Sequence, residues 1–284
     1  MFNVILENQN GDQLTFDMNS PYTIQEIQGL NPPDATINTS EIALIAGAKY
    51  NSAKVKMRQL MIAFAIEYSA AYNRINVYKV LKSKQWIRFY YTGDQRDVYI
   101  DGYIQSIDVS HFAMKQVVTC TILCPSPFFK AAQEVVNELK NIISAFHFPF
   151  SSTEEPQIVF GYFSNDVGIT IENEGDVETG LIIELYARSP ITNPKIFNYV
   201  TQDFIGVNYA MQTADQITID TRQGQKTVTL LRNGVETNIF NYVMKNSTWL
   251  QLEASGSTFV YEVASGVLGD LLVTFKHSNL YEGV

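Results

Sequence analysis

The sequence predicts a mainly β protein of two domains: a β-sandwich or barrel-like N-terminal domain with one or two helices, and a C-terminal β-sandwich. Short runs that alternate apolar and polar residues recur along the chain, and a period of two is typical of half-buried strands. Turn residues, such as the Asn-Gly pair at 233–234, separate many of these runs. With 284 residues, 46% of them hydrophobic and 17% charged, the chain is long and apolar enough for two folded cores.

The first strands are expected to form a hairpin. Residues 2–6 and 14–18 alternate in polarity, and the Gly-Asp pair at 11–12 supplies turn chemistry between them. A Pro-Pro-Asp segment at 32–34 then indicates a loop. Further strands of this half are expected at 42–46, 54–67, 85–92, 97–109 and 115–124.

Two segments interrupt the strand pattern and are expected to be helices. In 70–81 the apolar residues recur at helical spacing, and Ser69 is a suitable N-cap. Ser126 and Pro127 fit the N-cap and first-turn positions of a second, short helix over 128–143. The residues expected on the buried face of the first helix are Tyr72, Ile75, Tyr78 and Leu81.

The only two cysteines, Cys120 and Cys124, lie in the strand expected at 115–124. Four residues along a strand place them on one face about 13 Å apart, whereas a disulfide needs Cα atoms within about 7 Å. We therefore expect two buried thiols. The three histidines are scattered without ligand spacing, so no metal and no cofactor is expected.

A linker is expected at 146–156, where prolines, serines and paired glutamates replace the strand pattern. The predicted N-terminal domain is 1–145 and the C-terminal sandwich is 157–284, with a return of the last strand to the first domain left open. No proline follows Pro194, which suits continuous sheet pairing. The strands of this second half are expected at 157–162, 167–174, 180–186, 195–199, 207–211, 216–220, 227–231, 249–253, 258–263 and 271–277.

The two halves of the chain also differ in charge. The chain has 20 basic and 29 acidic residues, a net charge of −9, which argues against a protein whose main role is to neutralise nucleic-acid phosphates. Residues 1–150 hold 13 acidic and 13 basic residues, whereas 151–284 hold 16 and 7. The N-terminus lacks the basic and apolar regions of a signal peptide, and the longest apolar run, 60–66, is too short for a membrane helix.

No nucleophile elbow, phosphate loop or zinc spacing occurs in the sequence, and the chain is not expected to be an enzyme. A glycosidase pair would have to come from acidic residues that alternate along a strand end and a turn, where acids commonly serve the backbone. These residues are Glu172, Glu174, Asp176 and Glu178. Tyr90, Tyr91 and Tyr99 fit either a packed sheet or a neighbouring subunit, whereas Trp86 and Trp249 are expected in the core.

Several motifs occur in an order that resembles one family. Tyr-Ile-Asp-Gly-Tyr-Ile at 99–104 precedes a strand that ends in Cys-Pro-Ser-Pro-Phe-Phe at 124–129. Later come Ile-Thr-Ile-Glu-Asn at 169–173, Gly175-Asp176, Thr179-Gly180, Gln-Ile-Thr-Ile-Asp-Thr at 216–221 with Gly224, and Trp-Leu-Gln-Leu at 249–252. Over essentially its whole length the chain resembles siphophage distal tail proteins, the Dit components of phage tails. It departs from that family around 46–51 and Arg58, where an arginine-led, glycine-rich stretch is only loosely present.

The resemblance implies a structural hub with a galectin-like C-terminal sandwich. Such proteins form a hexameric ring at the tail tip, with N-terminal domains around the DNA channel and C-terminal domains that dock adsorption proteins. The implied partners are five further copies of the chain, the major tail tube protein, a tail-associated hub or fibre protein and a receptor-binding protein, without specific nucleic-acid or membrane binding. The implied location is the virion tail tip, after assembly in the cytoplasm of the host bacterium.

Seven positions are expected at interfaces or in the core: Tyr72, Ile75, Tyr78, Leu81, Tyr99, Phe128 and Phe129. A carbohydrate-binding module that aids adsorption is the alternative, since galectin-like folds often bind sugars, and it requires an exposed aromatic platform beside polar residues. A tail-associated lysin would need a catalytic pair or zinc site, and the sequence motifs supply neither.

Overall fold

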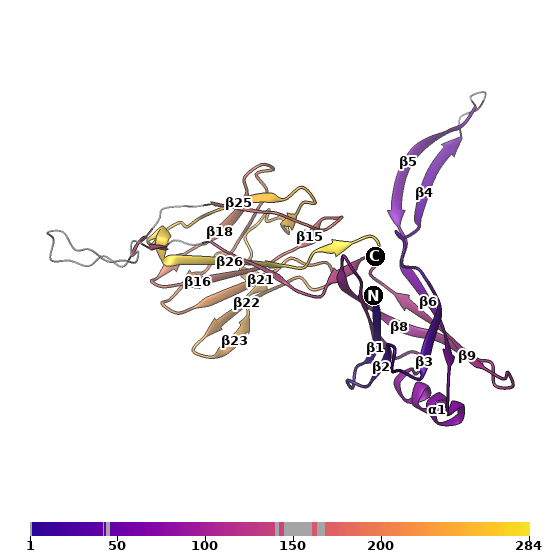
Figure 1. Ribbon diagram of the computed structural model, residues 1–284. Coiled ribbons are helices and arrows are strands. Elements are labelled where there is room, and N and C mark those ends of the chain that lie inside the picture. Colours follow the sequence, from indigo (N-terminus) through magenta and orange to yellow (C-terminus); the bar gives the residue numbers. More distant parts are fainter. Residues whose placement is uncertain (1, 42, 44–45, 140–141, 145–160, 164–167) are drawn as a thin grey trace, which may run out of the picture. The chain divides into compact units, whose positions relative to one another are not determined.

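The structure is a computed structural model that describes residues 2–41, 43, 46–139, 142–144, 161–163 and 168–284, and it confirms a mainly β protein (Figure 1). The chain divides into two compact units, 1–133 with 280–284, and 134–279. The boundary after residue 145 is therefore wrong, because the strand Val135–Glu138 already pairs with Leu271–His277 in the second unit. The linker expected at 146–156 lies outside the described residues.

One large antiparallel sheet forms the first unit, in the order β2-β1-β7-β8-β9-β6-β3, with β10 pairing to both β8 and β27. The hairpin at its start is confirmed, since β1 and β2 pair around the turn at Gly11. The elements are β1 (Asn3–Asn8), β2 (Gln13–Phe16), β3 (Tyr22–Gln28), β4 (Ala35–Glu41), β5 (Ala48–Val55), β6 (Arg58–Ile66), α1 (Ala70–Val80), β7 (Trp86–Thr92), β8 (Asp97–Val109), β9 (Gln116–Cys124), β10 (Phe129–Ala131) and β27 (Leu280–Tyr281).

Alternating burial along these strands builds the core of the first unit. Phe16, Tyr22 and Phe64 form an aromatic group in which Phe64 meets the other two rings edge-on, at centroid distances of 4.9 and 5.6 Å. Cys120 and Cys124 are both free and buried on β9, as expected, and burial raises the pKa of each thiol to about 12. At neutral pH these thiols are therefore protonated and poor nucleophiles.

Helix α1 is present, but its buried face is not the predicted one. Asn73, Val77 and Val80 face the core, while Tyr72, Ile75 and Tyr78 are exposed and only Leu81, just past the helix, is buried. Helical spacing shows which residues share a side of the helix, but not which side packs against the sheet. Here the contacts of Asn73 fix the buried side. Its backbone carbonyl accepts from the Tyr22 hydroxyl at 3.1 Å, and its side chain donates to the Tyr68 carbonyl at 2.6 Å. Ser69 is left-handed at the N-cap and makes no side-chain cap.

Three further expectations are wrong for reasons of pairing. The helix expected over 128–143 is replaced by strands, because residues 129–131 pair with β8 and β27, and residues 135–138 pair with the second unit's sheet. The strand expected at 42–46 is absent from its described residues, 43 and 46, which lie in the turn between β4 and β5. The long strand expected at 54–67 divides into β5 and β6 at Lys56 and Met57.

Arg58 ties distant segments of the first unit together. Its side chain is 3% exposed, and its Nε donates to the Pro127 carbonyl at 2.6 Å. Nη2 donates to the Glu282 carbonyl at 2.6 Å, in the C-terminal tail. Nη1 donates to the Asn31 carbonyl at 2.7 Å and also to the Gly29 carbonyl. We call this arrangement the Arg58 clasp; it supplies charge-assisted donors to four backbone acceptors at once.

The Cys-Pro-Ser-Pro-Phe-Phe motif and the chain end both contribute to this clasp. Phe129 is fully buried, and the Arg58 guanidinium carbon lies 4.4 Å from the centroid of its ring. A second arginine holds the tail: Arg96 Nη1 donates to the Gly283 carbonyl at 2.6 Å, and its guanidinium lies 4.2 Å from the Tyr281 ring centroid. The last strand thus belongs to the first unit, where β27 pairs with β10.

The second unit consists mainly of two antiparallel sheets, β11-β26-β16-β21-β22-β23 and β14-β25-β18-β19. Buried side chains of both sheets, including Leu185 and Phe275 of the first and Phe259 of the second, form one apolar core. The elements are β11 (Val135–Glu138), β12 (Ile142–Ser144), β13 (Gly161–Phe163), β14 (Gly168–Ile171), β15 (Thr179–Gly180), β16 (Ile182–Ala187), β17 (Ile191–Thr192), β18 (Lys195–Asn198), β19 (Phe204–Gly206), β20 (Ala210–Met211), β21 (Gln216–Asp220), β22 (Thr227–Arg232), β23 (Val235–Asn238), η1 (Phe240–Tyr242), β24 (Gln251–Leu252), β25 (Ser257–Glu262), η2 (Leu268–Asp270) and β26 (Leu271–His277).

His277, at the end of β26, is a buried titratable group of this unit. Its side chain is 1% exposed, and neither ring nitrogen hydrogen-bonds to any described residue. Burial lowers the pKa of His277 below its usual value, and the nearby Asn279 side chain and Glu174 carboxylate offset only part of that effect. The folded unit therefore favours the neutral imidazole.

Replacing Arg58 by methionine is expected to destabilise the first unit by about 3–5 kcal/mol, because each buried carbonyl that loses its donor costs about 1–3 kcal/mol. The chain has one tryptophan in each unit, so urea unfolding followed by fluorescence of Trp86, in a Trp249→Phe background, reports on this unit. The control is Arg74→Met, since Arg74 makes one side-chain bond, to Gln116; we expect a loss of less than about 1 kcal/mol. Equal losses in the two variants would contradict the clasp.

Acidification is expected to destabilise the second unit through His277. Because the folded pKa is depressed, the unfolded chain takes up a proton first as the pH falls below about 6.5. The contribution of His277 is therefore fully present above that pH and is lost as the pH falls toward the folded pKa. Urea unfolding followed by Trp249 fluorescence, in a Trp86→Phe background, gives the free energy of unfolding at pH 7.5 and at pH 5.5. Its decrease between these two pH values should be smaller for His277→Phe than for the parent chain. The control His111→Phe, which changes an exposed histidine, should show the same decrease as the parent chain. If His277→Phe also showed that decrease, His277 would not be the cause of the acid destabilisation.

Candidate functional site

A polar and aromatic surface lies on strands β7 and β8 of the first unit. The register sets Trp86 opposite Tyr103, Arg88 opposite Asp101 and Tyr90 opposite Tyr99. Because alternate residues of a strand share one face, these side chains point away from the core that Ile87 and Phe89 fill. We call these six residues the Arg88 face: Trp86, Arg88, Tyr90, Tyr99, Asp101 and Tyr103.

A two-point ion pair organises this face. Arg88 Nε lies 2.6 Å from Asp101 Oδ1, and Nη2 lies 3.1 Å from Oδ2. The Asp101 hydrogen bonds raise the pKa of Arg88 above its usual value. The Arg88 guanidinium carbon also lies 4.3 Å from the Tyr99 ring centroid and 5.2 Å from that of Trp86. Tryptophan, tyrosine and arginine are enriched among the few residues that dominate binding energy in protein interfaces, so this face is suited to recognition of another protein surface.

The Arg88 face is partly what the sequence suggests. Tyr99 was expected at an interface or in the core, and it lies half-buried on the outer face. Trp86 was expected in the core, but it also lies on this outer face, stacked near Arg88. Sequence reasoning did not single out Arg88 or Asp101. The available signal is the alternation Trp-x-Arg-x-Tyr on one strand and Tyr-x-Asp-x-Tyr on its neighbour.

The remaining predicted positions are dispersed over the first unit. Phe129 is buried in the Arg58 clasp and Phe128 is half-buried beside it. Tyr72, Ile75 and Tyr78 lie together on the exposed side of α1. The turn between β8 and β9 also exposes two large apolar side chains, Phe112 and Met114, which sequence reasoning did not identify.

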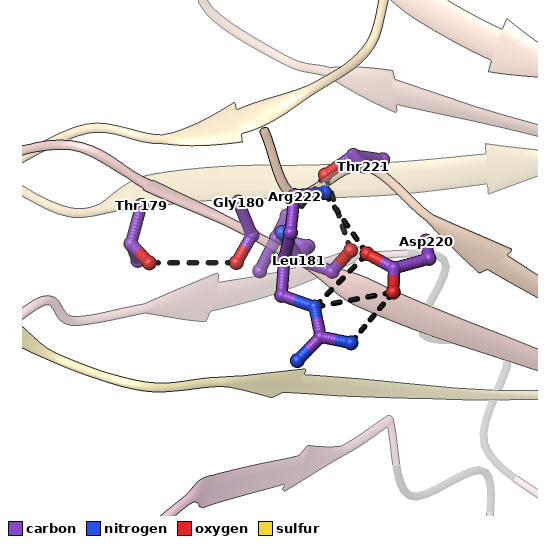
Figure 2. Close-up of polar contacts among 6 residues, drawn as sticks. All are labelled: Thr179, Gly180, Leu181, Asp220, Thr221 and Arg222. Carbon is purple, nitrogen blue, oxygen red and sulfur yellow. Dashed lines mark hydrogen bonds and ion pairs between the residues drawn. The ribbon is translucent and has the colours of Figure 1, made fainter. Parts of the chain in front are cut away.

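In the second unit, two of the family-like motifs meet at one junction (Figure 2). The Thr221 backbone and hydroxyl both donate to the Leu181 carbonyl, at 2.8 and 3.1 Å, and the Leu181 N–H donates to the Thr221 hydroxyl at 2.8 Å. Asp220 binds the Arg222 side chain at 2.6 Å. A Cβ on Gly180 would lie 2.5 Å from Arg222 Cα, so only glycine fits. These contacts therefore join β15, which consists of Thr179 and Gly180, to the end of β21 at Asp220 and Thr221.

The four acidic residues weighed as a glycosidase pair are all exposed, in the turn before β15. Asn173 closes this turn, since its Oδ1 accepts from the Gly175 N–H at 2.8 Å and its Nδ2 donates to the Val177 carbonyl at 3.0 Å. The prediction of a solvated turn is confirmed. Among the described residues, no group of three or more His, Cys, Asp or Glu is placed to hold a metal ion.

Trp249 was expected in the core; it is partly buried and packs against the edge of the second unit's core. Its ring stacks on Phe240 at a centroid distance of 5.7 Å and an interplanar angle of 26°. The Lys226 ammonium lies 5.4 Å from the same ring. Phe240 is 44% exposed, so the pair forms an aromatic patch at the surface of the second unit.

The described helices are short: α1 has 11 residues, and none of them has the length and apolarity needed to span a membrane.

A known protein family matches part of the second unit. Residues 174–278 match the family model of the siphovirus-type tail component, C-terminal domain. No curated protein has significant sequence similarity to the chain.

Solved structures extend the similarity in fold to the whole chain. The Dit protein of phage SPP1, described as a paradigm of the hub adsorption apparatus in phages that infect Gram-positive bacteria, superposes with a TM-score of 0.70 at 12% identity, over 99% of each chain. A chain of the phage P2 baseplate, in its activated conformation with Ca, superposes with a TM-score of 0.52 at 13% identity, over 100% of each chain. The match at 174–278 and the shared fold agree with the motifs in the sequence: residues 174–278 match the siphovirus-type tail component family, and the whole chain has the fold of the SPP1 Dit protein.

Proposed function

We propose that this chain forms a hexameric ring at the tail tip, which joins the tail tube to the tail-fibre or baseplate hub and docks adsorption proteins. The observation that carries the proposal is the fold shared with the SPP1 hub protein over 99% of both chains. The role is structural and involves no catalytic step. The partners are the major tail tube protein, a tail-associated hub or fibre protein and a receptor-binding protein, brought together in the cytoplasm of the host bacterium.

Charge supports a division of labour between the two units. The first unit holds 12 acidic and 12 basic residues, whereas the second holds 17 acidic and 8 basic residues. A neutral unit suits a ring through which the genome passes, because clustered cations would bind the phosphates and resist sliding. An acidic unit stays soluble and resists unspecific association, which suits a domain that projects from the ring and binds chosen partners.

Ring closure requires two different surfaces on each copy, because a head-to-tail contact joins unlike patches and closes by rotation. The first unit offers several unlike surfaces: the Arg88 face, the exposed side of α1 and the β8–β9 turn with Phe112 and Met114. Their tyrosine, tryptophan and arginine content is typical of protein interfaces.

Light scattering of the purified chain tests the ring, with an expected mass of six times that of one chain. Truncation of the Arg88 face by Arg88→Ala with Tyr99→Ala should lower the assembled fraction at least tenfold if this face is part of the ring contact. The control is Lys195→Ala with Glu262→Ala, an exposed ion pair of the second unit at 2.8 Å, which should leave the mass unchanged. A chain that stays monomeric at all concentrations would refute the ring.

A second candidate function is sugar binding by the second unit. The Phe240–Trp249 pair with Lys226 favours it, because sugars stack on aromatic rings beside polar groups. Glycan-array binding should then be lost in Trp249→Ala and kept in Tyr199→Ala, which removes an exposed aromatic residue elsewhere in the unit. An array on which the parent chain and Trp249→Ala give the same signal would exclude this site.

A further inference from the structure

The exposed side of α1 carries a stripe of large apolar residues. Tyr72, Ile75 and Tyr78 follow one another at a spacing of three residues, and the exposed Tyr68 precedes the helix. Their side chains are 76%, 54%, 38% and 57% exposed, respectively. Asn73, Val77 and Val80 cover the opposite side of the helix, against the core. The four residues Tyr68, Tyr72, Ile75 and Tyr78, here called the α1 stripe, are left uncovered by the described part of the chain.

The ribbon formed by β4 and β5 is uncovered along its whole length, since every residue of both strands is exposed. Its register nevertheless sorts the side chains by polarity. One face holds Ala35, Ile37, Thr39 and Glu41 with Ala48, Tyr50, Ala53 and Val55. The other holds Thr36, Asn38 and Ser40 with Lys49, Ser52 and Lys54. A bulge at Asn51 keeps the alternation in phase, and the Asn38 amide donates to the Ser52 hydroxyl at 3.0 Å on the polar face.

An isolated two-stranded ribbon is marginally stable in water and needs an apolar surface to pack on. Ile37 and Tyr50, on the apolar face, are 63% and 61% exposed, so the described chain does not supply that surface. The ribbon therefore has the properties of an arm that is completed by another molecule.

The α1 stripe of the same copy cannot be the partner. The ribbon leads into the start of β6, whereas α1 follows the end of β6, a strand of nine residues and thus about 30 Å long. Figure 1 shows the ribbon and α1 at opposite ends of this strand. Two different unpartnered surfaces at opposite ends of one unit suit a head-to-tail contact, which joins unlike patches.

The ribbon and the α1 stripe also match each other in length and in charge. Seven residues of β4 extend about 23 Å, and the 11 residues of α1 extend about 16 Å, so the ribbon can cover the helix. Glu41 is the only charged residue on the apolar face of the ribbon. Helix α1 carries Arg74 and Lys79 and no acidic residue, while the ribbon lysines lie on its other face and avoid these cations.

We propose that the apolar face of the β4–β5 ribbon of one copy packs on the α1 stripe of a second copy, and that repetition of this contact closes the ring. The inference rests on the proposed hexamer and names the surfaces that hold its copies together. Ile37 and Tyr50 lie against Tyr72 and Ile75 of the next copy, and Glu41 lies toward the cations of its helix.

Oxidative cross-linking tests this contact in the full chain. Ile37→Cys combined with Tyr72→Cys should yield a ladder of covalent multimers up to the ring, because each copy then joins the next. The native Cys120 and Cys124 are buried and have pKa values raised to about 12, so they do not compete. The matched control, Thr36→Cys with Tyr72→Cys, moves the thiol by one residue to the polar face and should cross-link at least fivefold less.

The outcomes separate this contact from the ring itself. A ring seen by light scattering that gives no ladder, or equal ladders from the two pairs, overturns the ribbon contact and leaves the hexamer standing; a monomer without cross-links refutes both. A second measurement needs no thiols: Ile37→Asp should raise the concentration at which the ring dissociates at least tenfold, and Thr36→Asp should change it less than twofold. A ring that tolerates Ile37→Asp unchanged would overturn the contact as well.

Discussion

The Arg58 clasp is the constraint on which the first unit depends. A buried guanidinium is stable only where its donors are satisfied, and here backbone carbonyls at the end of β3, in the Cys-Pro-Ser-Pro-Phe-Phe motif and in the C-terminal tail satisfy them. The clasp thereby explains why residues more than two hundred positions apart meet. It also holds the returning chain end, so that the second unit is attached to the first at both of its ends, at 133–134 and at 279–280.

That double attachment suits the role proposed for the chain, a connector between a tail tube and adsorption proteins. Each unit has its own apolar core, and the charges separate in the same way, into a neutral first unit and an acidic second one. Independent cores let the surface of the second unit vary without loss of the first. The closest backbone contacts of the second unit serve its fold. Gly180 packs against Arg222, and Thr221 and Leu181 are joined by hydrogen bonds.

The exposed surfaces of the first unit fit the proposed assembly. A soluble monomer rarely exposes large apolar patches without a use for them, yet the α1 stripe, the β4–β5 ribbon and the β8–β9 turn are all uncovered. The Arg88 face adds an ion pair framed by aromatic rings. Surfaces of this composition bury well against a partner because the arginine and tyrosine side chains combine apolar area with hydrogen-bonding groups.

Local periodicity alone was enough to predict the mainly β fold, the opening hairpin, helix α1 and the buried thiols of β9, because burial alternates with backbone geometry wherever one face of a strand meets a core. The order of short motifs was enough to predict the similarity to Dit proteins, which the match at 174–278 and the shared fold confirm. Three features depend on partners distant in the sequence and required the tertiary structure. The segment 129–138 forms strands because β8, β27 and β26 pair with it. The Asn73 side of α1, not the Tyr72 side, is buried because Tyr22 and Tyr68 bind there. Arg58 lies in the core because four carbonyls converge on it, and no local pattern encodes the position of groups that only the folded chain brings together.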